Sequence, residues 1–186
     1  MLREGGWFFL GRFSARGEDD DLRRAVTVME RVLAEAPARR GERQQHLSDL
    51  GIALRARFER WGDEADIDRA VSCHEQAMRS VRSADRRWPM QAENLANALW
   101  SRYLRFGSLA DLERAAKLHK QAAARFSERS AERPSCLSNL SLVLHAMYEH
   151  TGDLGYLEEA VTASRDSVAA GSGPGIRQSR VPCSTW

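Results

Sequence analysis

The segment WGDEADIDRAV, Trp61–Val71, decides the fold because the chain repeats it. FGSLADLERAA follows at Phe106–Ala116, TGDLGYLEEAV at Thr151–Val161, and a shorter copy, GEDDDLRRAV, precedes it at Gly17–Val26. Equivalent residues of the copies lie 45 positions apart, and no gap is needed to align them. A fixed period of this length is the signature of a repeat architecture, in which each copy is one small structural unit.

Each unit is predicted to be a helical hairpin. In the second unit an apolar stripe at spacings of three and four residues indicates one face of a first helix: Leu47, Leu50, Leu54 and Phe58. Gly62 follows where a helix needs a left-handed residue to end, and Asp63 or Asp66 can cap a second helix. The inward stripe of that second helix is Ile67, Ala70, Val71, His74, Ala77 and Met78. No segment alternates as a strand does.

A single hairpin cannot cover both of its apolar faces, so neighbouring copies must stack. The predicted fold is therefore all-α, an α-solenoid of stacked antiparallel helix hairpins. We expect a repeat domain over residues 1–170, with units at about 5–36, 42–81, 87–126 and 132–170. Residues 171–186 are rich in Gly, Ser and Pro and predict a disordered tail. The tail starts where another repeat would begin, so we expect a fragment of a longer array.

Composition argues against several classes of partner. The net charge of +2 gives no electrostatic reason to bind nucleic acid or a membrane surface. Three cysteines at unrelated spacings suggest neither a zinc site nor a disulfide framework. The apolar run Trp7–Leu10 is too short for a signal peptide or a membrane span. We expect a cytoplasmic chain with no nucleic-acid or membrane partner.

Candidate chemistry is equally sparse, so we expect no catalytic residue, metal or cofactor. The chain contains no nucleophile elbow, P-loop or GxGxxG motif. Cys73 and His74 are adjacent, and adjacent helical residues do not face each other. His74 and His119 occupy equivalent positions one repeat apart, roughly 10 Å by helix packing distances, which is too far for one metal ion. The acidic runs at the starts of second helices are explained by the helix dipole.

The second helices resemble those of tetratricopeptide repeats. Ala70-x-x-x-His74-x-x-Ala77 matches that family's Ala-x-x-x-aromatic-x-x-Ala pattern, as does the third unit, with His in the aromatic position. Asp49-Leu50-Gly51 resembles the family's Asn-Leu-Gly. The period of 45 exceeds the usual 34 and fits a longer first helix and an enlarged turn. The repeated phrase is most similar to fungal and actinobacterial arrays, including those that precede a CHAT peptidase domain and the aromatic di-alanine repeat proteins.

The resemblance implies a right-handed superhelix whose first helices line a concave, peptide-binding groove. Three positions off the core stripe of those helices give the candidates for that groove. The candidate peptide-binding residues are Asp49, Arg55, Asn94, Asn97, Trp100, Asn139 and His145. In the resembled family, Asn side chains on this helix bond the peptide backbone. The alternative is that these side chains are solvated, or that Trp100 packs against the neighbouring repeat.

The leading hypothesis is a non-catalytic protein–protein interaction scaffold that binds a peptide or a helix in its concave groove. The alternative hypothesis is a sensor or regulatory repeat fragment of a larger CHAT-peptidase or signalling ATPase protein. A third hypothesis, nucleic-acid binding, would use arginines expected on the convex side: Arg57, Arg60, Arg102 and Arg105. Uncapped repeat ends also allow self-association.

Overall fold

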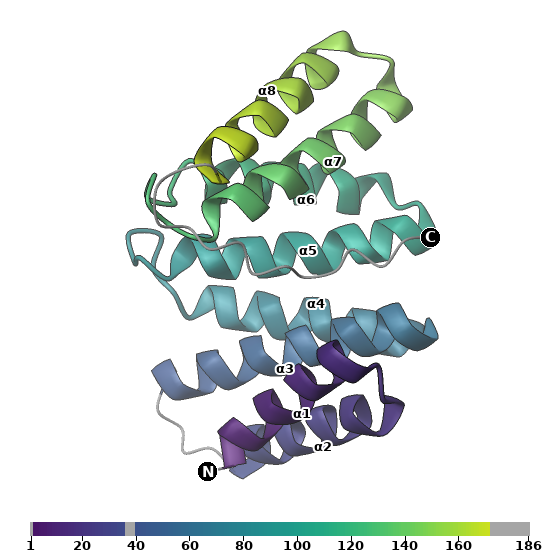
Figure 1. The fold of residues 1–186 in the computed structure, drawn as a ribbon, viewed down its shortest axis with the longest axis vertical. Helices are drawn as coiled ribbons and strands as arrows, with labels where there is room; N and C mark the ends of the chain where they lie inside the picture. Colours follow the sequence, from purple (N-terminus) through teal and green to yellow (C-terminus); the bar gives the residue numbers. More distant parts are fainter. Residues whose placement is uncertain (1, 36–39, 172–186) are drawn as a thin grey trace.

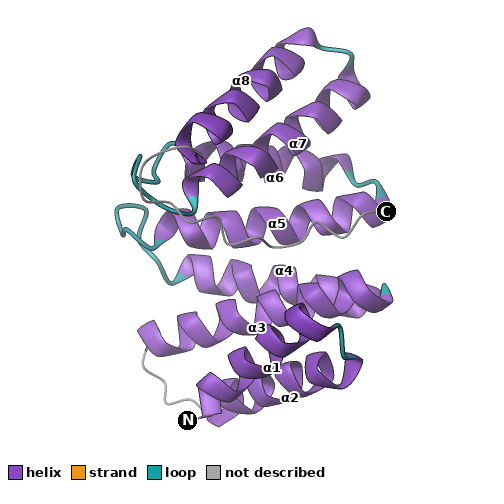
Figure 2. Cartoon of the chain, viewed as in Figure 1, coloured by secondary structure: helices purple, strands orange, loops and turns teal. Residues whose placement is uncertain are grey.

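The computed structural model describes residues 2–35 and 40–171 (Figure 1). These residues form helices joined by loops, and no strand occurs among them (Figure 2). The helices are α1 Leu2–Arg16, α2 Asp19–Glu35, α3 Arg40–Trp61, α4 Glu64–Arg79, α5 Trp88–Phe106, α6 Leu109–Ala123, α7 Arg133–Thr151 and α8 Leu154–Gly171. The predicted all-α class is confirmed. Gly171 ends α8, and the rest of the predicted tail, 172–186, lies outside the described residues.

The helices pack in consecutive pairs that stack in chain order (Figure 1). Within a unit α1 packs on α2, α3 on α4, α5 on α6 and α7 on α8. Between units each second helix packs on the first helix of the next unit. This nearest-neighbour arrangement is the α-solenoid that the sequence predicted. No helix of the described residues is both long enough and apolar enough to cross a membrane.

The turn between the two helices of each unit depends on a glycine. Gly17, Gly62, Gly107 and Gly152 have φ angles of 72°, 76°, 71° and 69°. A residue with a Cβ is disfavoured in this left-handed region, so glycine ends the first helix sharply. Asp63 then caps α4, because its carboxylate accepts a hydrogen bond of 3.1 Å from the Ala65 N–H. The repeated phrase therefore encodes one helix end and the next helix start.

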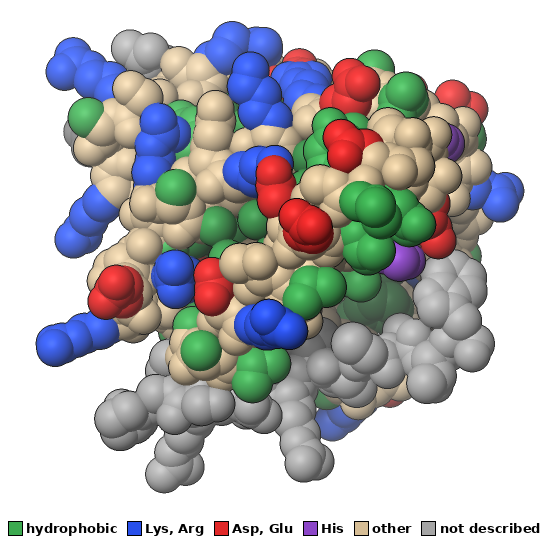
Figure 3. Space-filling model, turned by 90° about the horizontal axis from the view of Figure 1, so that it is seen from above, with side chains coloured by type: hydrophobic (Ala, Val, Ile, Leu, Met, Phe, Trp, Pro, Cys, Tyr) green, Lys and Arg blue, Asp and Glu red, His purple; other side chains and the backbone are tan. Residues whose placement is uncertain are grey.

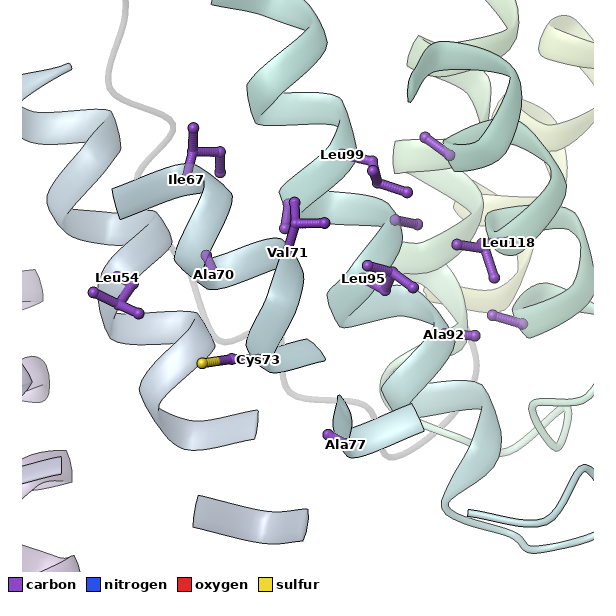
Figure 4. Packing of buried hydrophobic residues seen from close by; sticks show 14 of the residues in the cluster. Leu54, Ile67, Ala70, Val71, Cys73, Ala77, Ala92, Leu95, Leu99 and Leu118 are labelled. Atoms are coloured by element: carbon purple, nitrogen blue, oxygen red, sulfur yellow. The ribbon is translucent and has the colours of Figure 1, made fainter. Parts of the chain in front are cut away.

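Most of the core is one apolar cluster that runs from α1 to α7, and a smaller cluster of Leu140, Leu144, Ala160 and Ala163 joins α7 to α8. Leu54, Ile67, Leu99 and Leu112 are completely buried and come from four successive helices. Figure 4 shows Leu54, Ile67 and Leu99 on three successive helices of the larger cluster. Burial of a side chain of this size contributes about 1.5–3 kcal/mol. All of the stripe predicted for the second helix of the second unit is buried, except that Met78 is half-buried.

An ion pair joins the two helices in each of the first three units, and we call it the clasp. In the third unit the Arg102 Nε and Nη2 atoms donate to the two Asp111 carboxylate oxygens, both at 2.7 Å. The same two-point pairing joins Arg57 to Asp66 at 2.6 and 2.5 Å. In the first unit Arg12 Nε lies 3.0 Å from Asp21 Oδ2. The hydrogen bonds to Asp111 raise the pKa of Arg102, so its charge is permanent.

Candidate functional site: the groove along the first helices

The first helices form the inner side of the curved stack. Their backbones approach one another between units, α3 with α5 and α5 with α7, in addition to the contacts made through second helices. A stack of hairpins curves toward the side on which its helices approach most closely. The first helices therefore line the concave side.

A groove of about 830 Å³ lies along the first three of these helices. Its floor comes from α1, α3 and α5, and its rim comes from the loops that precede α5 and α7. The floor residues are Trp7, Gln45, Ser48, Asp49, Ile52, Pro89, Met90, Gln91 and Asn94. The rim residues are Arg86, Arg87, Arg125, Phe126, Ser127, Ser130 and Glu132. A volume in this range suits a bound segment with a few anchoring side chains.

The groove floor carries polar side chains that are mostly hydrogen-bonded. The Gln45 Nε2 atom donates to Asp49 Oδ1 at 2.9 Å, and Asn94 Nδ2 donates to Ser48 Oγ at 3.1 Å. The Oε1 atom of Gln91, a buried residue, has no hydrogen-bond partner among the described residues. An unsatisfied buried acceptor costs about 1–3 kcal/mol. This oxygen is closed to solvent, so a ligand N–H would pair with it only after the Gln91 side chain turns toward the groove.

The groove rim is basic, and some of its cations are held in fixed orientations. Arg87 donates to Asp85 Oδ2 at 2.7 Å and to Gln44 Oε1 at 3.2 Å. The hydrogen bonds that Asp85 accepts from the Arg87 side chain and backbone N–H lower the pKa of Asp85 to about 2. The guanidinium carbon of Arg125 lies 3.9 Å from the centroid of the Trp88 ring, which is a close cation–π contact. Asp85 neutralises Arg87, so the positive charge that the rim presents comes from Arg86 and Arg125. Arg125 is already ordered by its contact with Trp88, which lowers the entropy cost of using it.

Two of the residues predicted from the sequence, Asp49 and Asn94, line this groove. Asp49 is buried and Asn94 is half-buried. Asn97 and Asn139 instead meet across the junction of α5 and α7, where Asn139 Nδ2 donates to Asn97 Oδ1 at 3.1 Å. These two amides join neighbouring units.

The other three predicted residues lie further along the first helices, toward their carboxyl ends. Arg55 pairs with Glu59 one turn later on α3. The Trp100 ring stacks on Tyr103 at 5.4 Å between centroids, and His145 Nε2 lies 3.5 Å from the carboxylate of Glu149. The structure therefore does not bring Arg55, Trp100 and His145 together with Asp49 and Asn94 in one pocket.

Sequence reasoning missed Gln91, the loop arginines and Phe126. Gln91 lies three residues before Asn94, so one more helical turn along the predicted face would have found it. Arg86, Arg125 and Phe126 left no such signal, because they lie on loops whose path over the groove depends on tertiary structure. Sequence periodicity cannot give the direction of a loop side chain.

A cysteine–histidine contact missed by the sequence analysis lies in the core. Cys136 Sγ is 4.0 Å from His119 Nδ1, and both residues are completely buried. Burial, with Glu93 nearby, raises the pKa of Cys136 to about 12, and burial lowers the pKa of His119 to about 4. A neutral thiol beside a neutral imidazole, closed to solvent, is not an activated nucleophile. Within residues 2–35 and 40–171 no three potential metal ligands gather.

The comparisons with known proteins agree with this fold. The family model described as tetratricopeptide repeat matches residues 135–168, which fall in the fourth unit. Two structures of nearly identical TPR-like repeats, from a Podosopora anserina protein assigned as a kinesin light chain, share 20% identity with this chain at a TM-score of 0.66. The match to the first structure covers 95% of this chain and 76% of the chain in that structure. The match to the second covers 92% of this chain and 75% of the other. No curated protein matches the sequence.

The fold is a TPR-like helical repeat array. Identity of 20% establishes the architecture and carries no information on a ligand. The function must therefore be argued from the groove itself.

Proposed function

We propose that the chain is a non-catalytic interaction scaffold that captures an extended protein segment in the groove along α1, α3 and α5. The groove carries the proposal, because it runs along three first helices and is lined by the Gln91 and Asn94 side chains, whose amides can bond the backbone of an extended segment. The Asn94 amide can exchange its bond to Ser48 for bonds to a peptide backbone. The existing clasps and core hold these groups in place before binding.

Side-chain specificity would come from the apolar and basic parts of the groove. Ile52, Met90 and Phe126 offer partly exposed apolar contacts to side chains that alternate along an extended segment. Arg86 and Arg125 at the rim favour an acidic residue, or a terminal carboxylate, at the end of the segment nearest the loops. A bound segment with apolar residues followed by an acidic one is the expected ligand chemistry.

The nucleic-acid hypothesis has less support. Arg57 and Arg102 are engaged in clasps, and Arg60 donates to Asp19 at 2.8 Å. Neutralised arginines contribute little to phosphate binding, which depends on releasing counterions.

The test selects ligands from a random peptide library displayed on phage, then measures the affinity of selected peptides by fluorescence anisotropy. Gln91→Leu and Asn94→Ala should each weaken binding by about tenfold, which corresponds to one hydrogen bond. Arg105→Ala is the matched control, because that exposed side chain lies on α5 outside the groove. All variants should keep the helical circular dichroism of the parent. Selection of no peptide, or affinities unchanged by both groove variants, contradicts the proposal.

A further inference from the structure

The outer face of α8 exposes apolar side chains, and the central one, Val161, stands at a position that the other units bury. Val26, Val71 and Ala116 are equivalent residues of α2, α4 and α6, and each is at most 6% exposed because the next first helix covers it. Their counterpart Val161 on α8 is 43% exposed. Leu154, one heptad earlier, is 62% exposed, and Val168, one heptad later, is 68% exposed. The face therefore has the composition and periodicity of a helix-packing seam.

We propose that this face is the interface of a two-fold symmetric dimer, in which α8 packs antiparallel on α8 of a second copy of the chain. The inference goes beyond peptide capture and uses none of the groove residues. An antiparallel helix is also what covers the equivalent face inside the stack, because each second helix runs antiparallel to the first helix that follows it. The α8 face is thus suited in direction as well as composition.

The charges beside the seam favour the two-fold arrangement. Glu158 and Arg165 are both exposed and lie seven residues apart, on the same flank of the Leu154–Val161–Val168 line. When two copies of α8 pack antiparallel with Val161 near the centre, the flank that carries Glu158 and Arg165 on one copy faces the same flank on the other copy. Arg165 of each copy then meets Glu158 of the other, so the contact is formed twice. Figure 3 views the molecule from the α8 end and shows surface hydrophobic side chains among acidic and basic ones.

The competing arrangement, α8 of one copy stacked on α1 of another, is disfavoured by the same charges. At each internal junction an ion pair joins successive second helices: Glu30 with Arg69, Glu75 with Arg114, and Lys120 with Glu159. At an end-to-end junction the equivalent residues would be Arg165 and Arg24. Like charges at this position repel.

Steric fit also disfavours end-to-end stacking. Phe8 of α1 is 59% exposed and stands at the position that Ala53, Ala98 and Val143 occupy in the other first helices. Those three small residues are completely buried against the preceding unit. A phenylalanine at this point would have to displace atoms of the α8 face. End-to-end stacking would moreover give an open fibre, whereas the two-fold contact closes.

The experiment is sedimentation equilibrium of the complete chain from about 1 µM to about 500 µM, a range that spans weak dimers. We expect a monomer–dimer equilibrium that Val161→Glu abolishes. Arg165→Glu alone and Glu158→Arg alone should each raise the dissociation constant at least tenfold. The double variant Glu158→Arg/Arg165→Glu should return it to the parent value, because the pair is restored with exchanged charges. Arg24→Glu is the control and should change nothing.

Each contrary result overturns the proposal. A chain that stays monomeric throughout the range, or a dimer that survives Val161→Glu, shows that α8 is not the interface. Open-ended polymers that Phe8→Glu disperses would establish end-to-end stacking instead. If the double variant Glu158→Arg/Arg165→Glu fails to restore association, the proposed two-fold pairing of Glu158 with Arg165 is wrong, even if α8 is part of the interface. Circular dichroism of every variant separates these outcomes from loss of folding.

Discussion

The third and fourth units share one fold and differ in the chemistry that joins their two helices. Arg102 and Asp111 form the clasp of the third unit, and their equivalents in the fourth unit are Met147 and Tyr156. Met147 is buried and Tyr156 packs against the apolar core. The fourth unit lacks both clasp partners, so neither an unpaired Arg nor an unpaired Asp is left at these positions. The family model matches residues in the fourth unit, the one without a clasp.

This difference shows that the scaffold does not depend on the clasp. Replacing a largely buried ion pair by apolar residues of similar volume is often neutral or stabilising, whereas removing one partner is costly. What all four units keep is the left-handed glycine and the small residue at Ala25, Ala70, Ala115 and Ala160. The contrast between the units separates required features from interchangeable ones.

The largest expected effect concerns the buried histidines, which the fourth unit replaces by Ser164. Burial lowers the pKa of His74 to about 3 and that of His119 to about 4. The unfolded chain therefore binds more protons below pH 6.5, and the free energy of unfolding falls as the pH falls. As the pH falls from 6.5 to 5, each histidine should lower the free energy of unfolding by about 2 kcal/mol.

Urea denaturation across this pH range tests the expectation with His74→Met/His119→Met, which copies Met29 of the first unit. The double variant should lose most of the acid sensitivity, and Ser164→Ala should leave it unchanged. Equal acid sensitivity in parent and double variant would assign the effect to other groups.

The second prediction transplants the fourth unit's pair into the third. Asp111→Tyr alone leaves the Arg102 guanidinium, which is three-quarters buried, with only Asp68 as a carboxylate partner. We expect a loss of about 2–3 kcal/mol, below the range for fully buried pairs because Arg102 keeps its ion pair with Asp68 and some hydration. The double variant Arg102→Met/Asp111→Tyr should recover stability to within about 1 kcal/mol of the parent. Thermal and urea unfolding measure both, and a double variant no better than the single one would show that the clasp is required.

The third prediction concerns Glu93, whose equivalents are Ser48 and Ser138. Burial, and to a lesser extent the charge of Glu132, raises the pKa of Glu93 to about 7. The folded chain then binds more protons between pH 4.5 and pH 7, so this residue's contribution to stability is lost as the pH rises. Glu93→Gln should stabilise the fold by about 2 kcal/mol at pH 8 and by little at pH 5. A gain that does not vary with pH would point to packing instead of ionisation.

The smallest effect is expected at the junction pairs, which have opposite polarity in different parts of the stack. Lys120 pairs with Glu159, whereas Glu75 pairs with Arg114 at the preceding junction. Because these groups are largely exposed, Lys120→Glu should cost less than about 1 kcal/mol. Adding Glu159→Arg should restore the lost stability, because the pair is then re-formed with exchanged charges. A double-mutant cycle at low salt measures the coupling energy of the pair. A coupling energy of zero would mean that the charges play no part in matching neighbouring units.

The sequence by itself determined the architecture. The 45-residue period, the glycines and the apolar spacing of three and four residues are local properties of a helical hairpin, so they can be found without knowing how units stack. The clasp was also within reach, because Arg and Asp recur nine residues apart in three units. Its geometry depends only on one hairpin. The predicted second-helix stripe was confirmed for the same reason.

Only the tertiary structure decided which polar residues share the groove. Asn94 lies on the floor while Asn97, one turn later, bonds Asn139 of the next unit, because the angle between successive units brings α5 and α7 together at that point. That angle is the sum of many side-chain contacts, and no periodic pattern encodes it. The same holds for Arg125 and Phe126, which reach the groove from a loop. The positions of residues along a helix follow from local geometry, whereas the lining of the groove depends on the packing angle between neighbouring units.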